Sequence, residues 1–107
     1  MIARTWQGVV PESKSDQYFE YLKNTGVRDI KKTEGNQGVF VFRRNEDGKS
    51  RFFMLSLWDS FESIQKFAGD KIEKAYYYPE DKDYLIDLEP FVHHFEVLTA
   101  TLNSEIY

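Results

Sequence analysis

The chain has 107 residues, of which 41% are hydrophobic and 17% aromatic, enough for one packed core and too apolar for a disordered protein. Its net charge is −4, and residues 70–90 alone hold seven acidic against three basic side chains. The rest of the chain is neutral, so the sequence offers no basic surface that would bind nucleic acid or an anionic membrane. The sequence contains no cysteine, which excludes disulfides, thiolate metal ligands and a cysteine nucleophile.

No apolar run approaches the ~20 residues that span a bilayer. The first residues also lack the charged segment and apolar stretch of a signal peptide. We therefore expect a cytoplasmic protein with a single domain over residues 1–107, its core in about residues 1–100 and a short C-terminal tail after it.

Residues 1–10 are rich in β-formers and predict a strand that ends at Pro11. A helix should follow, with Ser13 or Ser15 as its N-cap and an aromatic and aliphatic stripe on one side. Gly26 is expected to end this helix.

After a basic stretch and a glycine-rich turn, residues 39–44 predict a second strand. The Asp-Gly pair within residues 45–48 indicates a tight hairpin, and residues 51–58 form the returning strand.

Asp59 and Ser60 are expected to cap a second helix over residues 61–68, which Gly69 ends. A short helical continuation is predicted over residues 71–76, and residues 91–100 predict the last strand. The order β-α-β-β-α-β is that of an α+β, ferredoxin-like two-layer sandwich.

Both faces of the central hairpin are apolar. In the third strand Phe52 and Met54 alternate with Phe53 and Leu55, and the second strand repeats the pattern. Two helices cover only one face of such a sheet, and burying each Phe or Leu is worth about 1.5–3 kcal/mol. A second copy of the chain, packed sheet against sheet, is the simplest cover, so we expect a homodimer.

Three short motifs suggest a family: GNQG at 35–38, LSLWDS at 55–60, and HHFEV at 93–97. With the element order, they make residues 1–98 resemble the dimeric α/β-barrel superfamily and, within it, the antibiotic biosynthesis monooxygenase (ABM) family. The resemblance implies a homodimer with a ligand pocket between sheet and helices in each subunit. Some members are cofactor-independent oxygenases that convert polycyclic phenols to quinones, and others bind and cleave haem.

The departures from these members are informative. Quinone-forming members carry an Asn and a Trp on the second helix, where this chain has Ser63 and Phe67. Haem-degrading members use the same Trp together with an Asn on the first strand, where this chain has Trp6 or a neighbour. They also have a His ligand just past the second helix, where this chain has Tyr77. No cofactor is therefore expected, and haem, although compatible with the family, is disfavoured.

The two histidines, His93 and His94, are adjacent on the last strand and point to opposite faces, so they cannot ligate one metal together. No metal site is expected. His93 shares its face with Phe95, an environment that suits a base lining the pocket or a hydrogen-bonded core histidine. His94 shares a face with Glu96 and is expected at the sheet surface or at an interface.

Arg4 and Trp6 lie on one face of the first strand, where they suit an anionic or planar ligand. The alternative for Arg4 is an ion pair with an acid of residues 80–89. Consecutive tyrosines, Tyr76 to Tyr78, cannot all face inward from a regular element, so at least one should be exposed or contact the partner, while others line the pocket.

These residues give the expected site. His93 and Arg4 are the predicted catalytic pair, a base and an anion-stabilising cation, and the ligand walls are Trp6, Phe67, Tyr76, Tyr77 and Phe95. The leading hypothesis is an ABM-like monooxygenase that oxidises an electron-rich aromatic substrate without a cofactor. The alternatives are a non-catalytic dimer that binds a small hydrophobic or aromatic ligand, and a haem-binding or haem-degrading protein.

Overall fold

The computed structural model describes residues 1–103; the last four residues of the expected C-terminal tail lie outside the described residues. The elements, in chain order, are β1 (Ile2–Pro11), η1 (Glu12–Lys14), α1 (Ser15–Asn24), α2 (Gly26–Lys32), β2 (Asn36–Glu46), β3 (Lys49–Trp58), α3 (Phe61–Ala68), η2 (Asp81–Asp83) and β4 (His93–Glu96). Within residues 1–103, no helix has the length and apolar character needed to cross a membrane.

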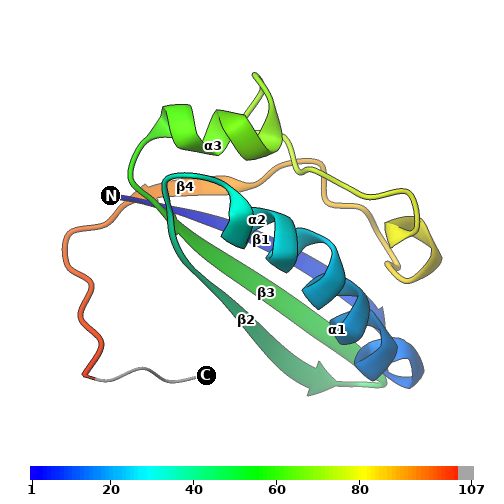
Figure 1. The fold of residues 1–107 in the computed structure, drawn as a ribbon. Helices are drawn as coiled ribbons and strands as arrows, with labels where there is room; N and C mark the ends of the chain where they lie inside the picture. Colours follow the sequence, from blue (N-terminus) through cyan, green and yellow to red (C-terminus); the bar gives the residue numbers. More distant parts are fainter. Residues whose placement is uncertain (104–107) are drawn as a thin grey trace.

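The strands form one antiparallel sheet in the order β2-β3-β1-β4. The helices lie on one face of this sheet, where α1 and α2 run along the strands and α3 lies near the end of β3 (Figure 1). This confirms the predicted α+β ferredoxin-like sandwich. We call the opposite face, which no described residue covers as a layer, the open face.

The hairpin between β2 and β3 forms as predicted. Asp47 and Gly48 both have positive φ, 54° and 75°, and they connect the paired residues Glu46 and Lys49. Two residues with positive φ are the geometry of a type I′ turn, which matches the twist of the flanking strands. The turn therefore fixes the register of the central strands and decides which side chains face the helices.

The second predicted helix, α3, is also confirmed. The Ser60 hydroxyl accepts a hydrogen bond from the Ser63 N–H at 3.2 Å, and Gly69 ends the helix with φ of 84°. Ile64 is fully buried against the sheet, whereas Phe61 at the start of the helix is 49% exposed.

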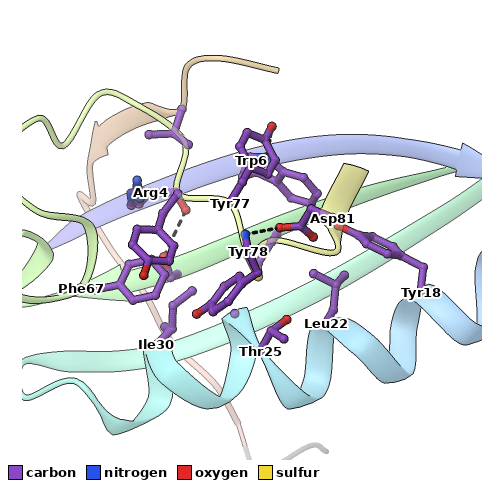
Figure 2. A pocket seen from close by; sticks show the side chains of 15 residues that line it. Arg4, Trp6, Tyr18, Leu22, Thr25, Ile30, Phe67, Tyr77, Tyr78 and Asp81 are labelled. Atoms are coloured by element: carbon purple, nitrogen blue, oxygen red, sulfur yellow. Dashed lines mark hydrogen bonds between the residues drawn. The ribbon is translucent and has the colours of Figure 1, made fainter. Parts of the chain in front are cut away.

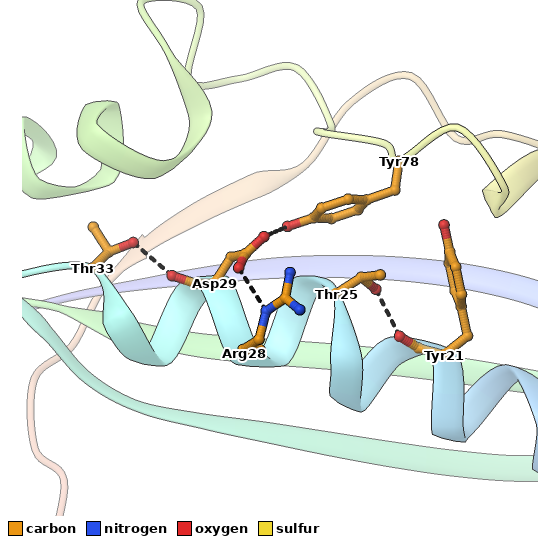
Figure 3. Close-up of polar contacts among 6 residues, drawn as sticks. All are labelled: Tyr21, Thr25, Arg28, Asp29, Thr33 and Tyr78. Atoms are coloured by element: carbon orange, nitrogen blue, oxygen red, sulfur yellow. Dashed lines mark hydrogen bonds and ion pairs between the residues drawn. The ribbon is translucent and has the colours of Figure 1, made fainter.

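The first helix differs from the prediction at both ends. Lys14 occupies the N-cap without a side-chain bond, and the Ser15 hydroxyl instead accepts from Arg43 Nη1 at 3.1 Å. At Thr25 the backbone leaves the helical region, and Gly26 begins α2 rather than ending the helical region. The Thr25 hydroxyl donates to the Tyr21 carbonyl at 2.8 Å across this break (Figure 3).

Residues 69–92, which we call the cover segment, do not contain the helix predicted over 71–76. The Ala75 N–H donates to the Pro90 carbonyl and the Val92 N–H to the Glu73 carbonyl, so the two ends of the segment pair with each other. This pairing satisfies backbone groups that a helix would have used. It also shortens the last strand, which spans only β4 instead of residues 91–100.

Between sheet and helices the core divides into two clusters. One contains Val10, Tyr18, Leu22, Phe52 and Leu85, and the other contains Ile30, Trp58 and Ile64. Trp58, at the end of β3, is fully buried in the second cluster.

Candidate functional site

A cavity lies at the boundary of the two core clusters. It is bounded by β1 and β3 of the sheet, by the break between α1 and α2, and by the cover segment (Figure 2). Its free volume is about 40 Å³. That volume accommodates a few water molecules and is far below the roughly 300–1,000 Å³ of typical ligand pockets. Five of the predicted site residues line it together: Arg4, Trp6, Phe67, Tyr76 and Tyr77.

Arg4 is a buried cation without an acidic partner among the described residues. Its side chain is 6% exposed, and its Nη2 donates to the Lys74 carbonyl at 3.0 Å. Its Nε makes no hydrogen bond within residues 1–103. The guanidinium lies 5.9 Å from the centre of the Phe67 ring, and burial lowers the Arg4 pKa to about 10. The alternative of an ion pair with an acid of residues 80–89 is therefore not what the structure shows.

Trp6 forms one aromatic wall, and Gly8 explains its orientation. A Cβ added at Gly8 would overlap the six-membered ring of Trp6, so the indole occupies the space that any larger residue at this position would need. The Trp6 Nε1–H donates to the Tyr77 hydroxyl at 3.0 Å, and that hydroxyl donates to the Glu89 carbonyl. Burial raises the pKa of Tyr77. This chain of bonds attaches the cover segment to the sheet.

All three consecutive tyrosines line the cavity, because the backbone there is neither helix nor strand. Tyr76 is also 50% exposed, which confirms that at least one of them reaches solvent. The Tyr78 hydroxyl donates to Asp29 Oδ2 on α2 at 2.6 Å, and Asp29 also accepts from Arg28 Nε at 3.0 Å (Figure 3). These bonds lower the pKa of Asp29 and attach the cover segment to the helices as well.

The cavity has a second polar end, which the sequence did not predict. Tyr18 on α1 is fully buried, Asp81 on η2 is 4% exposed, and the phenol points toward the carboxylate (Figure 2). Asp81 Oδ2 accepts from the Tyr78 N–H at 2.6 Å, whereas the Tyr18 hydroxyl makes no hydrogen bond of normal geometry within residues 1–103. Burial raises the pKa of both groups. In the sequence, Tyr18 reads as part of an apolar stripe and Asp81 as one acid of many.

His93 and Phe95 lie elsewhere, contrary to their predicted place in the cavity. β4 pairs with β1 so that His93 is opposite Thr5 and His94 is opposite Arg4. Directly opposed residues share a face, so His93 and Phe95 point to the open face, and both are exposed.

His94, expected at a surface or interface, lies on the helix side. There it packs edge-on against Phe61 at 5.9 Å. Burial, and then the charge of Arg4, lower its pKa. No histidine lines the cavity among the described residues, and no group of three or more metal-binding side chains occurs within residues 1–103.

Comparisons by sequence gave no relatives: no protein-family profile matches the chain, and no curated protein matches it. Solved structures match clearly. A proposed antibiotic biosynthesis monooxygenase from Bacillus cereus is 19% identical, with a TM-score of 0.64 over 94% of this chain and 97% of that chain. A protein of unknown function from Nitrosomonas europaea is 13% identical, with a TM-score of 0.68 over 97% and 95%.

The haem-degrading protein MhuD from Mycobacterium tuberculosis, solved with two haems in its active site, is 15% identical. Its TM-score is 0.59 over 94% of this chain and 99% of that chain. The chain therefore has the fold of the antibiotic biosynthesis monooxygenases, as the sequence motifs suggested.

Proposed function

We propose that the protein binds an electron-rich aromatic molecule as its anion in this cavity and oxidises it with O₂, without a cofactor. Arg4 carries the proposal. Burying an unpaired charge is strongly unfavourable, so a guanidinium on a cavity wall whose Nε–H has no acceptor within residues 1–103 indicates that an anion belongs beside it. The walls of Trp6, Phe67 and the tyrosines suit the flat body of an aromatic ligand.

The chemistry follows from that charge. A phenol whose oxygen lies beside the Arg4 guanidinium ionises more readily, because the cation stabilises the phenolate. The phenolate is the electron donor: it reduces O₂, one oxygen atom becomes the second carbonyl of a quinone, and the other leaves as water. One phenol and one O₂ thus give one quinone and one water. The apolar walls exclude bulk water and strengthen the interaction between the anion and Arg4.

The ligand enters only if the cover segment moves, since about 40 Å³ is too small for an aromatic ring system. Three side-chain hydrogen bonds hold the part of the segment next to the cavity: Arg4 to the Lys74 carbonyl, Trp6 to Tyr77, and Tyr78 to Asp29. The far part is fixed more firmly, by the backbone bond from the Ile86 N–H to the Val9 carbonyl and by the buried side chain of Leu85. A neutral bond contributes about 0.5–1.5 kcal/mol and one to a charged group about 1.5–3 kcal/mol, so a local displacement of residues 76–78 costs less than release of the whole segment.

The open face supports a homodimer. Phe42 and Phe95 are 52% and 55% exposed there, and Phe53, Leu55 and Leu57 are only partly buried. A second copy would cover this apolar surface and leave one cavity in each subunit. Sedimentation at micromolar concentration should give a mass near twice 12.7 kDa. Phe42→Asp should yield a folded monomer, and a monomeric wild type would contradict the dimer.

The test of function uses anthrone, whose enol is a phenol and whose oxidation product is anthraquinone. We expect the protein to consume one O₂ per anthraquinone formed and Arg4→Met to abolish the acceleration. Arg44→Met is the matched control, because Arg44 is exposed and pairs with Glu46 at 3.1 Å, remote from the cavity. Equal rates for wild type and Arg4→Met would refute the role of Arg4.

The second candidate is binding without turnover. It is favoured by one observation: His93, the predicted base, lies outside the cavity, so no imidazole is available there to take the substrate proton. Calorimetric binding of an aromatic anion that depends on Arg4, with no O₂ uptake, would establish this candidate in place of the oxygenase.

Haem fits the site poorly. No histidine lines the cavity among the described residues, and the Tyr77 hydroxyl already bonds to both Trp6 and Glu89. A tyrosinate ligand would have to break both contacts and ionise a phenol whose pKa burial raises.

A further inference from the structure

Among residues 1–103, two buried polar atoms without a hydrogen-bond partner belong to residues on the same cavity. They are Arg4 Nε and the Tyr18 hydroxyl, and both side chains are at least nine-tenths buried. Buried polar groups are nearly always hydrogen-bonded, so each such exception needs a physical explanation. Arg4 already has one in the proposed anion. Tyr18 has none yet.

Arg4 and Tyr18 lie at opposite ends of the cavity. Figure 2 shows Arg4 beside Phe67 at one end and Tyr18 with Asp81 at the other, with Trp6, Tyr77 and Tyr78 between them. One end is therefore cationic. The other presents a phenolic O–H donor next to a carboxylate acceptor.

A donor and an acceptor side by side match one ligand group in particular. A hydroxyl accepts one hydrogen bond and donates another, so it can take the Tyr18 proton donor and the Asp81 acceptor at once. A ligand carboxylate would be repelled by Asp81, and an ether could use only the Tyr18 donor. One oxygen of Asp81 accepts from the Tyr78 N–H, which holds the carboxylate in place at this end of the cavity.

We propose that the cavity recognises an aromatic molecule with two polar ends: an anionic oxygen at Arg4 and a hydroxyl at the opposite end, held by Tyr18 and Asp81. This rests on the proposed function, because it takes the anion at Arg4 as given. It adds a second recognition site that selects among aromatic anions. Tyr18 and Asp81 act in binding and positioning, and neither is required for the electron transfer to O₂.

The experiment compares three non-oxidised probes by calorimetry on the intact protein: benzoate, para-hydroxybenzoate and para-methoxybenzoate, with the corresponding naphthoates as longer versions. The carboxylate stands in for the anionic oxygen at Arg4. In at least one of the two series the hydroxy acid should bind about tenfold more tightly than its parent, as expected for two added hydrogen bonds. The methoxy acid should gain less.

Variants then locate the effect. Tyr18→Phe and Asp81→Asn should each remove most of the tenfold preference while leaving affinity for the parent acid within about twofold. Asp81→Asn keeps an oxygen for the Tyr78 N–H, and Asp83→Asn, an exposed acid of the same short helix, is the matched control that should retain the preference.

The outcomes separate the two proposals. Binding of the parent acids that depends on Arg4, with no preference for the hydroxyl or with a preference that survives in Tyr18→Phe, overturns this inference and leaves the proposed anion site intact. Failure of every acid to bind wild type overturns both. Loss of the preference in Asp83→Asn as well would place the hydroxyl elsewhere and also overturn it.

Discussion

Arg4→Met should stabilise the protein while removing its ligand. The fall of the Arg4 pKa to about 10, more than two pH units below the ordinary arginine value, reflects burial of the charge. At about 1.4 kcal/mol per pH unit, this corresponds to a penalty of about 3 kcal/mol in the folded state. Because the folded pKa is lowered and the group is a base, the penalty is complete at every pH below about 10 and is relieved only above it.

The substitution also removes the hydrogen bond from Nη2 to the Lys74 carbonyl. Such a bond from a charged donor contributes about 1.5–3 kcal/mol, so the net gain is about 1 kcal/mol. Methionine fills a similar length of the apolar wall, which limits the loss of packing. In a domain of this size, about 1 kcal/mol corresponds to a melting temperature higher by about 4 °C.

The assay is thermal and urea unfolding at pH 7, at one fixed protein concentration because a dimer's stability depends on it. Arg44→Met should change stability by less than about 0.5 kcal/mol, as expected for an exposed side chain. If Arg4→Met instead lowers the free energy of unfolding by more than about 1 kcal/mol, then contacts within the protein already compensate the burial of the guanidinium charge. The inference that an anion is missing beside it would then fail.

Three further predictions concern the buried carboxylate of Asp81, the binding of haem, and His93, which lies outside the cavity. Burial raises the pKa of Asp81 in the folded state, so the folded protein binds this proton more tightly than the unfolded chain does. The stability of the protein therefore falls as the pH rises from the unfolded-state pKa of about 3.9 through the higher folded-state pKa. Asp81→Asn should therefore be more stable than wild type at pH 7, with the difference shrinking toward pH 3; a constant difference would contradict this. Titration with hemin should give no saturable one-to-one complex in the Soret absorbance. A saturable complex whose haem degrades when a reductant is added would contradict the expectation that haem does not fit this site. His93→Gln should leave affinity for para-hydroxybenzoate within about twofold, since His93 faces away from the cavity, and a tenfold loss would show that the open face contributes to the site.

Local signals in the sequence determined the order of the elements. The Asp-Gly turn at residues 47 and 48 requires positive φ at both positions, and Ser60 with Gly69 marks both ends of α3. The alternation of Phe52 and Met54 with Phe53 and Leu55 placed the two faces of the sheet correctly, because strand geometry has a fixed period of two. Arg4 and Trp6 were assigned to one face for the same reason.

Only the tertiary structure decided which face of the last strand points inward. Both faces of this sheet are apolar, so hydrophobicity does not separate them, and the choice depends on the register between β4 and β1. That register puts His94 opposite Arg4 and turns His93 to the open face. A slip of one residue would have exchanged them, and nothing local in residues 91–97 specifies it.

The second polar end of the cavity also depended on the tertiary structure. Tyr18 and Asp81 are separated by more than 60 residues, and they meet because the two ends of the cover segment pair with each other instead of forming a helix. Pairing of this kind depends on which buried backbone N–H and C=O groups still need a hydrogen-bond partner once the other elements have formed. No short stretch of sequence reveals this. The sequence thus determined which side chains were available to the site, and the pairing of β4 and the cover segment determined which of them share the cavity.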